Sequence, residues 1–342
     1  MRAAFRADAS IAIGNGHVAR CLVLAEALRR HGVESIFLCR ALRGHPADWI
    51  ARRGFEVRLL PDDLPLDEDA AACAAALSGG TDALVVDHYG LDRRWEAAMR
   101  DRCRLRLAID DLPDRVHECE ILLDPNLAPR MEERHARGLP PSCRQLLGPR
   151  HALLHPAFGE WAPRAPERAR VRRLLLFFGG GDAADLTGRA LRELEPLDLP
   201  GDVVIGAAHP RRAAIEALCP KSSGRWTLHV QTDRMPELMA NADLALGAGG
   251  GSHWERCLMG LPAIVAVAAD NQAASTAALA ARGACLSLGP AESLASGAFL
   301  GAVETLATHP ADLAAMSRAA RGVVPDGAGA ERVAQALLEA LP

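Results

Sequence analysis

The fold is decided near the amino terminus, where residues 3–31 read AAFRADASIAIGNGHVARCLVLAEALRRH. Residues 3–7 are a short, mostly apolar run of the kind that forms a buried strand. From His17 to His31 apolar residues recur every three or four positions, and Gly32 supplies a stop, which predicts a helix with one face packed on a sheet. A strand, a glycine-containing turn and a helix in this order open a doubly wound parallel sheet.

The same alternation of strand and helix continues along the chain and predicts an α/β fold with parallel sheets covered on both faces. The further predicted strands are residues 35–39, 56–60, 83–87, 105–110, 174–178, 203–205, 227–230, 244–246 and 263–267, and a second clear helix is predicted over residues 252–259.

Two domains are expected, because 342 residues exceed the roughly 100 to 200 of a usual domain. The stretch 154–166 carries three prolines and little periodicity, which is typical of a linker. We therefore predict an N-terminal Rossmann-like domain over residues 1–155, a linker over 156–172 and a C-terminal Rossmann-like domain over 173–342, with the last helix able to pack back on the first domain.

Composition narrows the possible partners. The formal net charge is -4, with 49% hydrophobic and 24% charged residues, so no positive field draws in nucleic acid or an anionic membrane. No apolar run approaches the ~18 residues of a membrane span, and no signal peptide is evident. The nine cysteines are scattered without a Cys-x-x-Cys pair, which favours reduced thiols. We expect a cytoplasmic, monomeric protein.

The turn Gly14-Asn15-Gly16-His17 is the first candidate ligand site. Glycines let the backbone approach a ligand, and the following helix presents free N–H groups to an anion or a sugar. The third glycine of a dinucleotide fingerprint is replaced by Ala19, which disfavours a nicotinamide-dependent dehydrogenase. Because a helix N-terminus disfavours positive charge, His17 is expected to be neutral and basic; the alternative is a capping or packing role.

Two further glycine-rich turns follow predicted strands in the second half, at residues 179–182 and 247–252. Successive N–H groups at a helix N-terminus can cradle a diphosphate without lysine. Glu255, in the first turn of its helix, is placed to accept hydrogen bonds from ribose hydroxyls. The alternatives are tight turns for the glycines and a capping box between Ser252 and Glu255.

Polar residues also end several predicted strands, at Asp87-His88-Tyr89, Asp110-Asp111, Asp124-Pro125-Asn126 and Asp270-Asn271-Gln272. They are candidate hydrogen-bonding groups for a sugar, although such residues are also ordinary caps and turn formers. No metal-binding signature is present, since His151 and His155 lack a third ligand. We expect neither a metal nor another cofactor.

In combination these motifs resemble the PseG family, UDP-sugar hydrolases of pseudaminic acid biosynthesis. The resemblance covers about residues 1 to 290. It is carried by residues 6–10 (RADAS), 14–21 (GNGHVARC), 86–90 (VDHYG), 124–127 (DPNL), 147–150 (LGPR), 177–182 (FFGGGD), 249–257 (GGGSHWERC) and 270–272 (DNQ).

This resemblance implies a GT-B fold related to the MurG glycosyltransferase, with two Rossmann-like domains facing across a cleft. It implies hydrolysis of UDP-2,4-diacetamido-2,4,6-trideoxy-β-L-altropyranose by water, with inversion at the anomeric carbon and UDP held mainly by the C-terminal domain. His17 matches the catalytic base, Tyr89 a residue beside it, Glu255 the ribose-binding carboxylate and Asn271 a sugar-contacting amide. The other candidate substrate contacts are Arg6, Asp8, Gly14, Gly16, Asp87, His88, Asn126, Gly179, Gly180, Gly249, Gly250, Gly251, Ser252 and Gln272.

The sequence departs from the family pattern at Asn15, Ala19 and residues 251–253, which leaves the exact sugar open. Two other functions remain. A MurG-like glycosyltransferase needs a second acceptor pocket, and for a lipid acceptor an apolar patch that is not evident in the first domain. A regulatory UDP-sugar-binding module needs no base, and His17 is then only a cap.

Overall fold

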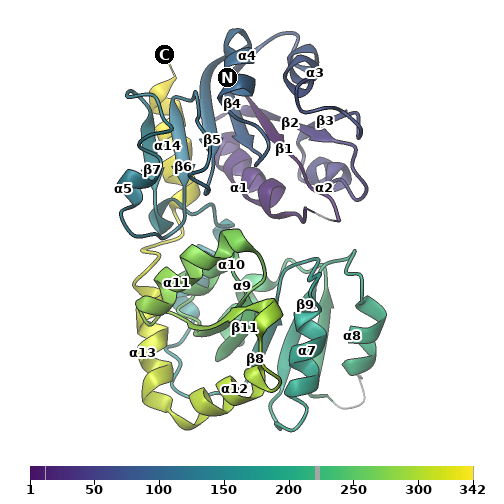
Figure 1. The fold of residues 1–342 in the computed structure, drawn as a ribbon, viewed down its shortest axis with the longest axis vertical. Coiled ribbons are helices and arrows are strands. Elements are labelled where there is room, and N and C mark those ends of the chain that lie inside the picture. The colour runs from purple at the N-terminus through teal and green to yellow at the C-terminus, as the bar shows by residue number, and fades with distance from the viewer. Residues whose placement is uncertain (12, 220–223, 342) are drawn as a thin grey trace. The chain divides into compact units, whose positions relative to one another are not determined.

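A computed structural model describes residues 1–11, 13–219 and 224–341, which form two compact α/β units (Figure 1). The first unit comprises Met1–Leu154 and the segment that starts at Ala328, and the second unit comprises His155–Gly327. Each unit has one parallel sheet covered by helices.

The first unit contains a seven-stranded sheet in the order β3-β2-β1-β4-β5-β6-β7. The chain winds outward from β1 to β3 and then returns to the other side of β1 with β4. This reversal is a topological switch point, where ligands of doubly wound sheets bind at the carboxyl ends of the strands. The strands are β1 Arg2–Ala7, β2 Glu34–Arg40, β3 Glu56–Leu60, β4 Thr81–Asp87, β5 Cys103–Ile109, β6 Ile121–Asp124 and β7 Arg144–Leu147.

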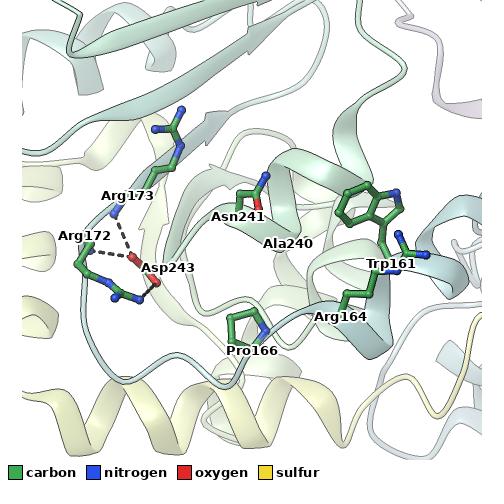
Figure 2. Close-up of a pocket in the computed structure, with 8 residues that line it drawn as sticks. All are labelled: Trp161, Arg164, Pro166, Arg172, Arg173, Ala240, Asn241 and Asp243. Carbon is green, nitrogen blue, oxygen red and sulfur yellow. Dashed lines mark hydrogen bonds and ion pairs between the residues drawn. The ribbon is translucent and has the colours of Figure 1, made fainter.

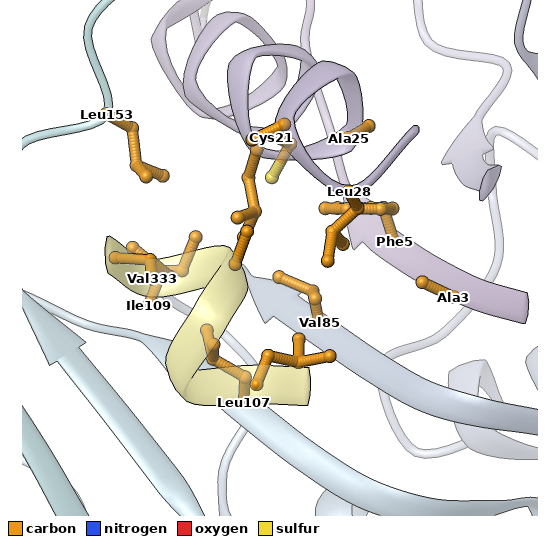
Figure 3. Close-up of a cluster of buried hydrophobic side chains, with 14 of the residues drawn as sticks. Ala3, Phe5, Cys21, Ala25, Leu28, Val85, Leu107, Ile109, Leu153 and Val333 are labelled. Carbon is orange, nitrogen blue, oxygen red and sulfur yellow. The ribbon is translucent and has the colours of Figure 1, made fainter. Parts of the chain in front are cut away.

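Helices from both ends of the chain close the core of the first unit. Figure 3 shows Phe5 and Val85 from the sheet beneath Cys21 and Leu28 of α1, with Val333 of α14 beside them. These side chains are buried, so the last helix completes the core that the first strand begins. The helices are α1 Gly16–Arg30, α2 Ala47–Arg52, α3 Asp69–Ala76, α4 Arg93–Ala98, α5 Met131–Arg134 and α14 Gly329–Ala340.

The second unit contains a six-stranded parallel sheet in the order β10-β9-β8-β11-β12-β13, with its switch point between β8 and β11. The strands are β8 Leu174–Phe177, β9 Gly201–Ile205, β10 Trp226–Val230, β11 Leu244–Ala248, β12 Ala263–Val267 and β13 Leu286–Pro290. The helices are α6 Pro156–Trp161, α7 Leu186–Glu193, α8 Arg212–Leu218, α9 Met235–Asn241, α10 Ser252–Leu258, α11 Ala273–Ala281, α12 Ala298–Thr308 and α13 Pro310–Arg321.

The structure differs from the sequence-based expectation in two places. Strands β6, β7 and β13 are additional, since runs of four or five residues carry too little pattern to be recognised. The proline-rich stretch 154–166, predicted to be an irregular linker, contains α6 and the short helix η3 Ala162–Arg164. Pro156 is the first residue of α6, a position where the missing N–H costs nothing and the fixed φ favours the helix.

Arg168, which lies in the segment between η3 and β8, is a buried cation that no described carboxylate pairs with. It is 1% exposed, and its guanidinium donates to the carbonyls of Ala242 (3.2 Å), Met239 (2.8 Å) and Met259. These carbonyls lie at the C-terminal ends of α9 and α10, where helices carry partial negative charge. Burial, together with Arg321, lowers the pKa of Arg168 to about 10, so the charge is costly and the carbonyls offset that cost.

We expect Arg168→Met to lower the free energy of unfolding of the second unit by about 3–5 kcal/mol, because several buried carbonyls lose their donor. Arg170→Met is the matched control, since Arg170 is exposed, and should change stability by less than about 0.5 kcal/mol. Urea unfolding followed by circular dichroism measures both. Equal stabilities for the two variants would contradict the capping role of Arg168.

Candidate functional site

The candidate site of the first unit lies at its switch point. Strands β1 and β4 are neighbours there, with Ala7 opposite Asp87 at their carboxyl ends. The loop after β1 returns through Gly14, whose φ of +79° suits glycine and whose N–H donates to the Ser10 carbonyl (2.8 Å). The loop therefore delivers the start of α1, and His17 with it, to the end of β4.

Asp87 is the charged centre of this site. Its carboxylate is bonded to His17 Nδ1 (Oδ1, 2.6 Å) and accepts from Arg20 Nε (Oδ2, 2.5 Å) and Nη2 (Oδ1, 2.6 Å). Burial opposes ionisation of this side chain, yet Arg20 and then His17 hold the pKa of Asp87 well below its usual range. Asp87 is therefore an ionised acceptor that holds both partners in place.

The contact with Asp87 fixes the tautomer of His17. In the neutral imidazole, an ionised carboxylate accepts the Nδ1–H and the lone pair lies on Nε2. Nε2 has no partner among the described residues, and the side chain is 14% exposed. Tyr89 packs edge-on against the imidazole with ring centroids 4.9 Å apart, and its hydroxyl donates to Asp111 (2.9 Å). The arrangement suits general-base chemistry, because one imidazole nitrogen is held by Asp87 and the other has no partner among the described residues.

Arg6 and Asp8 lie beneath this edge. Arg6 is fully buried and donates to Asp8 (2.6 Å) and to Asp69 (2.6 Å), so its guanidinium faces the protein interior. Asp8 also accepts from the N–H and Nε of Arg40, and His88 Nε2 lies 3.4 Å from it. Arg6 and Asp8, which were predicted to contact substrate, therefore bond other protein groups and stabilise the end of β1. His88 is only half-buried.

Asn126 follows β6 on the same edge of the sheet. Its backbone N–H donates to Asp124 (2.9 Å) in a tight Asx turn, while its side-chain amide makes no hydrogen bond with the described residues. Among the predicted polar contacts of the first unit, this amide is one that the structure leaves available for a ligand.

Arg20 is a site residue that the sequence analysis missed. It was not among the predicted site residues, yet it binds Asp87 and lies 3.8 Å from Asp111. Its spacing of three from His17 carries the signal, because residues i and i+3 share a helix face.

His117 clamps the loop that carries Asp111. It is buried between Glu96 (Nδ1 to Oε1, 2.7 Å) and Asp110 (Nε2 to Oδ2, 2.8 Å). Burial disfavours the cation, but the hydrogen bonds to Asp110 and Glu96 outweigh it and raise the pKa of His117 to about 9. At neutral pH this imidazolium therefore holds the carboxylates of Glu96 and Asp110 together. Asp110 directly precedes Asp111, which accepts the hydrogen bond from Tyr89.

In the second unit the glycine-rich turn after β8 is closed by its own carboxylate. Asp182 accepts from the N–H groups of Leu186 (3.0 Å) and Thr187 (2.7 Å) at the start of α7. The Gly180 carbonyl accepts from the N–H of Gly206 (3.1 Å), and a Cβ on Gly206 would meet that oxygen at 2.5 Å. Gly206 is thus required for close backbone packing against Gly180, and Gly179 has a φ of +99° that suits glycine. Two of the N–H groups at the start of α7 already have an acceptor.

The turn after β11 is open. The N–H groups of Gly250, Gly251 and Ser252 have no acceptor among the described residues, and no side chain caps α10. Gly250 has φ +85°, which turns the chain so that these groups precede the helix. The capping box considered as the alternative is absent, since the Ser252 hydroxyl and the Glu255 carboxylate bond no described residue. We call residues 249–252 the open loop.

The open loop is held by Gln272 and lies next to the carboxyl group of Glu255. Gln272 Oε1 accepts from the N–H groups of Gly249 (3.1 Å) and Ala268 (3.1 Å), so it acts as a clasp, and half-buried Asn271 adjoins it. Burial raises the pKa of Glu255 to about 7, although part of the residue stays accessible. The carboxyl therefore changes its charge near neutral pH and is free to bond a ligand.

A cavity of about 330 Å³ lies elsewhere in the second unit (Figure 2). It is lined by Trp161, Arg164 and Arg173, among others, and Asp243 accepts from the backbone N–H groups of Arg172 and Arg173 on its rim. These residues precede β8 and β11, so the cavity lies at the amino ends of the strands, opposite the edge that carries the open loop. Within the described residues, no cluster of three or more His, Cys, Asp or Glu side chains could hold a metal, and no helix is long and apolar enough to cross a bilayer.

Comparison with solved structures defines the class of fold. The glycosyltransferase of kitacinnamycin superposes with a TM-score of 0.68 at 18% identity over 100% of this chain and 99% of its own. MurG of Acinetobacter baumannii superposes with a TM-score of 0.65 at 16% identity over 99% of both chains. Two parallel-sheet α/β units with these neighbours are the GT-B fold, as expected from the sequence.

Curated relatives match only part of their own length or of this chain. An uncharacterised protein of Methanocaldococcus jannaschii is 23% identical over 78% of this chain and 55% of its own length. The spore coat polysaccharide biosynthesis protein SpsG of Bacillus subtilis is 31% identical over 42% and 44%, respectively. The UDP-2,4-diacetamido-2,4,6-trideoxy-beta-L-altropyranose hydrolase of Campylobacter jejuni is 26% identical over 57% and 66%. The chain thus spans about half to two thirds of these relatives, and no protein-family model matches it.

The His117 clamp predicts a pH dependence of stability. The folded-state pKa, about 9, lies above the usual value near 6.5, so protonation stabilises the first unit. This contribution, on the order of 2 kcal/mol, is complete below about pH 6.5 and is lost as the pH rises through about 9. Urea unfolding of wild type and His117→Gln at pH 6.5, 8 and 9.5 measures it. The stability difference between them should shrink at pH 9.5, and a constant difference would contradict an imidazolium clamp.

Proposed function

We propose that the protein is an inverting UDP-sugar hydrolase in which His17 activates water. The observation that carries the proposal is the His17–Asp87 pair at the switch point of the first unit, with Nε2 of His17 unoccupied by any described residue. A base oriented by a buried carboxylate is the group that deprotonation of water requires.

In the proposed reaction a water oxygen attacks the anomeric carbon while its proton passes to His17 Nε2. The bond from that carbon to the diphosphate oxygen breaks, and its electrons leave with UDP. Asp87 stabilises the imidazolium that forms. The unpaired N–H groups of the open loop are suited to the leaving diphosphate, and Glu255 to the ribose. One displacement from one face inverts the anomeric centre.

The mechanism requires a single UDP-sugar to reach both His17 and the open loop. We propose on this basis that the sugar is contacted by the N-terminal domain, predicted as residues 1–155, and UDP by the C-terminal domain that follows the predicted linker at 156–172, while α14 packs on the first unit. The relative from Campylobacter jejuni is named for hydrolysis of a UDP-di-N-acetyl sugar, which supports that substrate class. His88, Asn126 and Asn271 are the proposed sugar contacts.

A second candidate is a glycosyltransferase with an apolar acceptor. Several exposed large apolar side chains of the first unit lie on loops that follow the carboxyl ends of β1, β3, β4 and β5, namely Ile11, Ile13, Leu66, Tyr89 and Val116. The sequence alone did not reveal this grouping. Release of UDP without any added acceptor separates the hydrolase from this transferase.

The first test of the proposal is His17→Ala. We expect kcat for UDP release from a UDP-di-N-acetyl sugar to fall by about 10²–10⁴, while the affinity for UDP changes by less than about twofold. Asp87→Asn should also lower kcat, because the base loses its oriented tautomer. His31→Ala, at the other end of α1, is the matched control and should retain wild-type activity. A fully active His17→Ala enzyme would remove His17 from the mechanism.

The second test concerns Glu255. Because its pKa is about 7, the carboxyl is mostly neutral at pH 6 and mostly ionised at pH 8. If the ionised form accepts the ribose hydroxyls, UDP should bind wild type about tenfold more tightly at pH 8 than at pH 6. Glu255→Gln removes this titration and keeps that of UDP itself. Calorimetry at both pH values compares them, and identical pH dependence in the two proteins would exclude the role of Glu255.

A further inference from the structure

Two thiols of the first unit lie side by side at the amino ends of β6 and β7, at the opposite edge of the sheet from Asp87. The Sγ atoms of Cys119 and Cys143 are 3.8 Å apart in a small apolar cluster with Ala108 and Leu122. Cys119 precedes β6 and Cys143 immediately precedes β7, which is its neighbour in the sheet. The N–H of Arg144 donates to the Glu120 carbonyl (2.9 Å), so main-chain bonds hold the two segments together.

The two thiols differ in exposure and in acidity. Cys119 is 2% exposed, whereas Cys143 is partly accessible to solvent. A hydrogen bond from the Cys119 thiol, the N–H of Leu122 and the nearby His117 imidazolium lower the pKa of Cys143 against the effect of burial. The same thiol pair contact, with burial, raises the pKa of Cys119. Ionisation of the pair therefore favours its more accessible member, Cys143.

No other cysteine of the chain shares this setting. The pKa of each of the seven cysteines outside the pair is raised, with burial as the largest cause, to about 11 for Cys103 and about 12 for Cys39, for example. Cys103 is also partly accessible, but its thiol donates to the Met99 carbonyl and has no thiol neighbour among the described residues. Thiolate content and access govern the rate of oxidation, so Cys143 is the preferred target.

We propose that Cys143 and Cys119 form a peroxide-reactive thiol pair that closes to an intramolecular disulfide. The Cys143 thiolate attacks one peroxide oxygen, the O–O bond breaks, and the departing hydroxide takes a proton to become water. Cys119 then loses its proton and attacks the sulfenic sulfur of Cys143, and the S–O bond breaks with release of a second water. Two thiols are oxidised by two electrons and one peroxide is reduced.

The bond requires modest movement, because the sulfurs must approach from 3.8 Å to about 2.05 Å. It closes a loop that contains β6, Asn126 and α5, so oxidation tethers this whole segment at its two ends. The inference stands on the thiol geometry and does not depend on the proposed hydrolase activity.

The experiment treats the reduced full-length protein with a small excess of hydrogen peroxide at pH 7 and maps the peptides without reduction. We expect a Cys119–Cys143 disulfide that forms before any other cysteine oxidises and that dithiothreitol reverses. Cys119→Ser should stop at the sulfenic acid of Cys143, which dimedone traps. Cys143→Ser should leave Cys119 reduced.

Cys103→Ser is the matched control and should form the disulfide at the wild-type rate. Iodoacetamide labelling supplies an independent measure, in which Cys143 of wild type should react at least about tenfold faster than Cys103 at pH 7. Oxidation spread evenly over the cysteines, or equal alkylation rates for Cys143 and Cys103, would overturn the proposal.

Discussion

The buried carboxylate of Asp87 is the constraint on which the candidate site depends. A lone carboxylate at this depth is expensive, and it is ionised here because Arg20 and His17 both bind it. The same contacts order α1 against the end of β4, so loss of the charge would release the helix start and the base together. Stability of the sheet edge and orientation of His17 are therefore consequences of one interaction.

The two glycine-rich turns of the second unit differ in how they treat the free N–H groups at the start of the following helix. At α7 the chain supplies its own anion, Asp182, and the loop is closed. At α10 no side chain caps the helix, and the clasp from Gln272 holds the turn at Gly249 while leaving the next amides unpaired. Because unpaired N–H groups are costly unless they meet water or a ligand, the difference points to the second turn as the place for an anion.

Sequence pattern predicted the fold, and it did not report contacts between residues that lie far apart in the chain. The strong periodicity of α1 and the apolar runs of β1 and β4 are local signals, and they located His17 and Asp87. By contrast, Arg6 was predicted to contact substrate, yet its partner Asp69 is 63 residues away and no local pattern reports that pairing. The closure of the α7 turn by Asp182 was equally invisible, because an aspartate after three glycines is compatible with either a cap or a ligand site.

Buried arginines show why the open loop is suited to negative charge. The charge of Arg6 is balanced by two carboxylates, and that of Arg168 is stabilised by hydrogen bonds to helix carbonyls. Arg256, 3% exposed beneath the open loop, donates to the Ala248 carbonyl (2.8 Å) and to neutral His253 (3.1 Å), and its Nε has no partner in the described structure. Burial lowers the pKa of the Arg256 guanidinium, because its protein partners do not fully offset the loss of water around the charge. An anion bound to the adjacent N–H groups would supply negative charge near the Arg256 guanidinium. Arg256 and the unpaired N–H groups therefore both favour an anionic ligand.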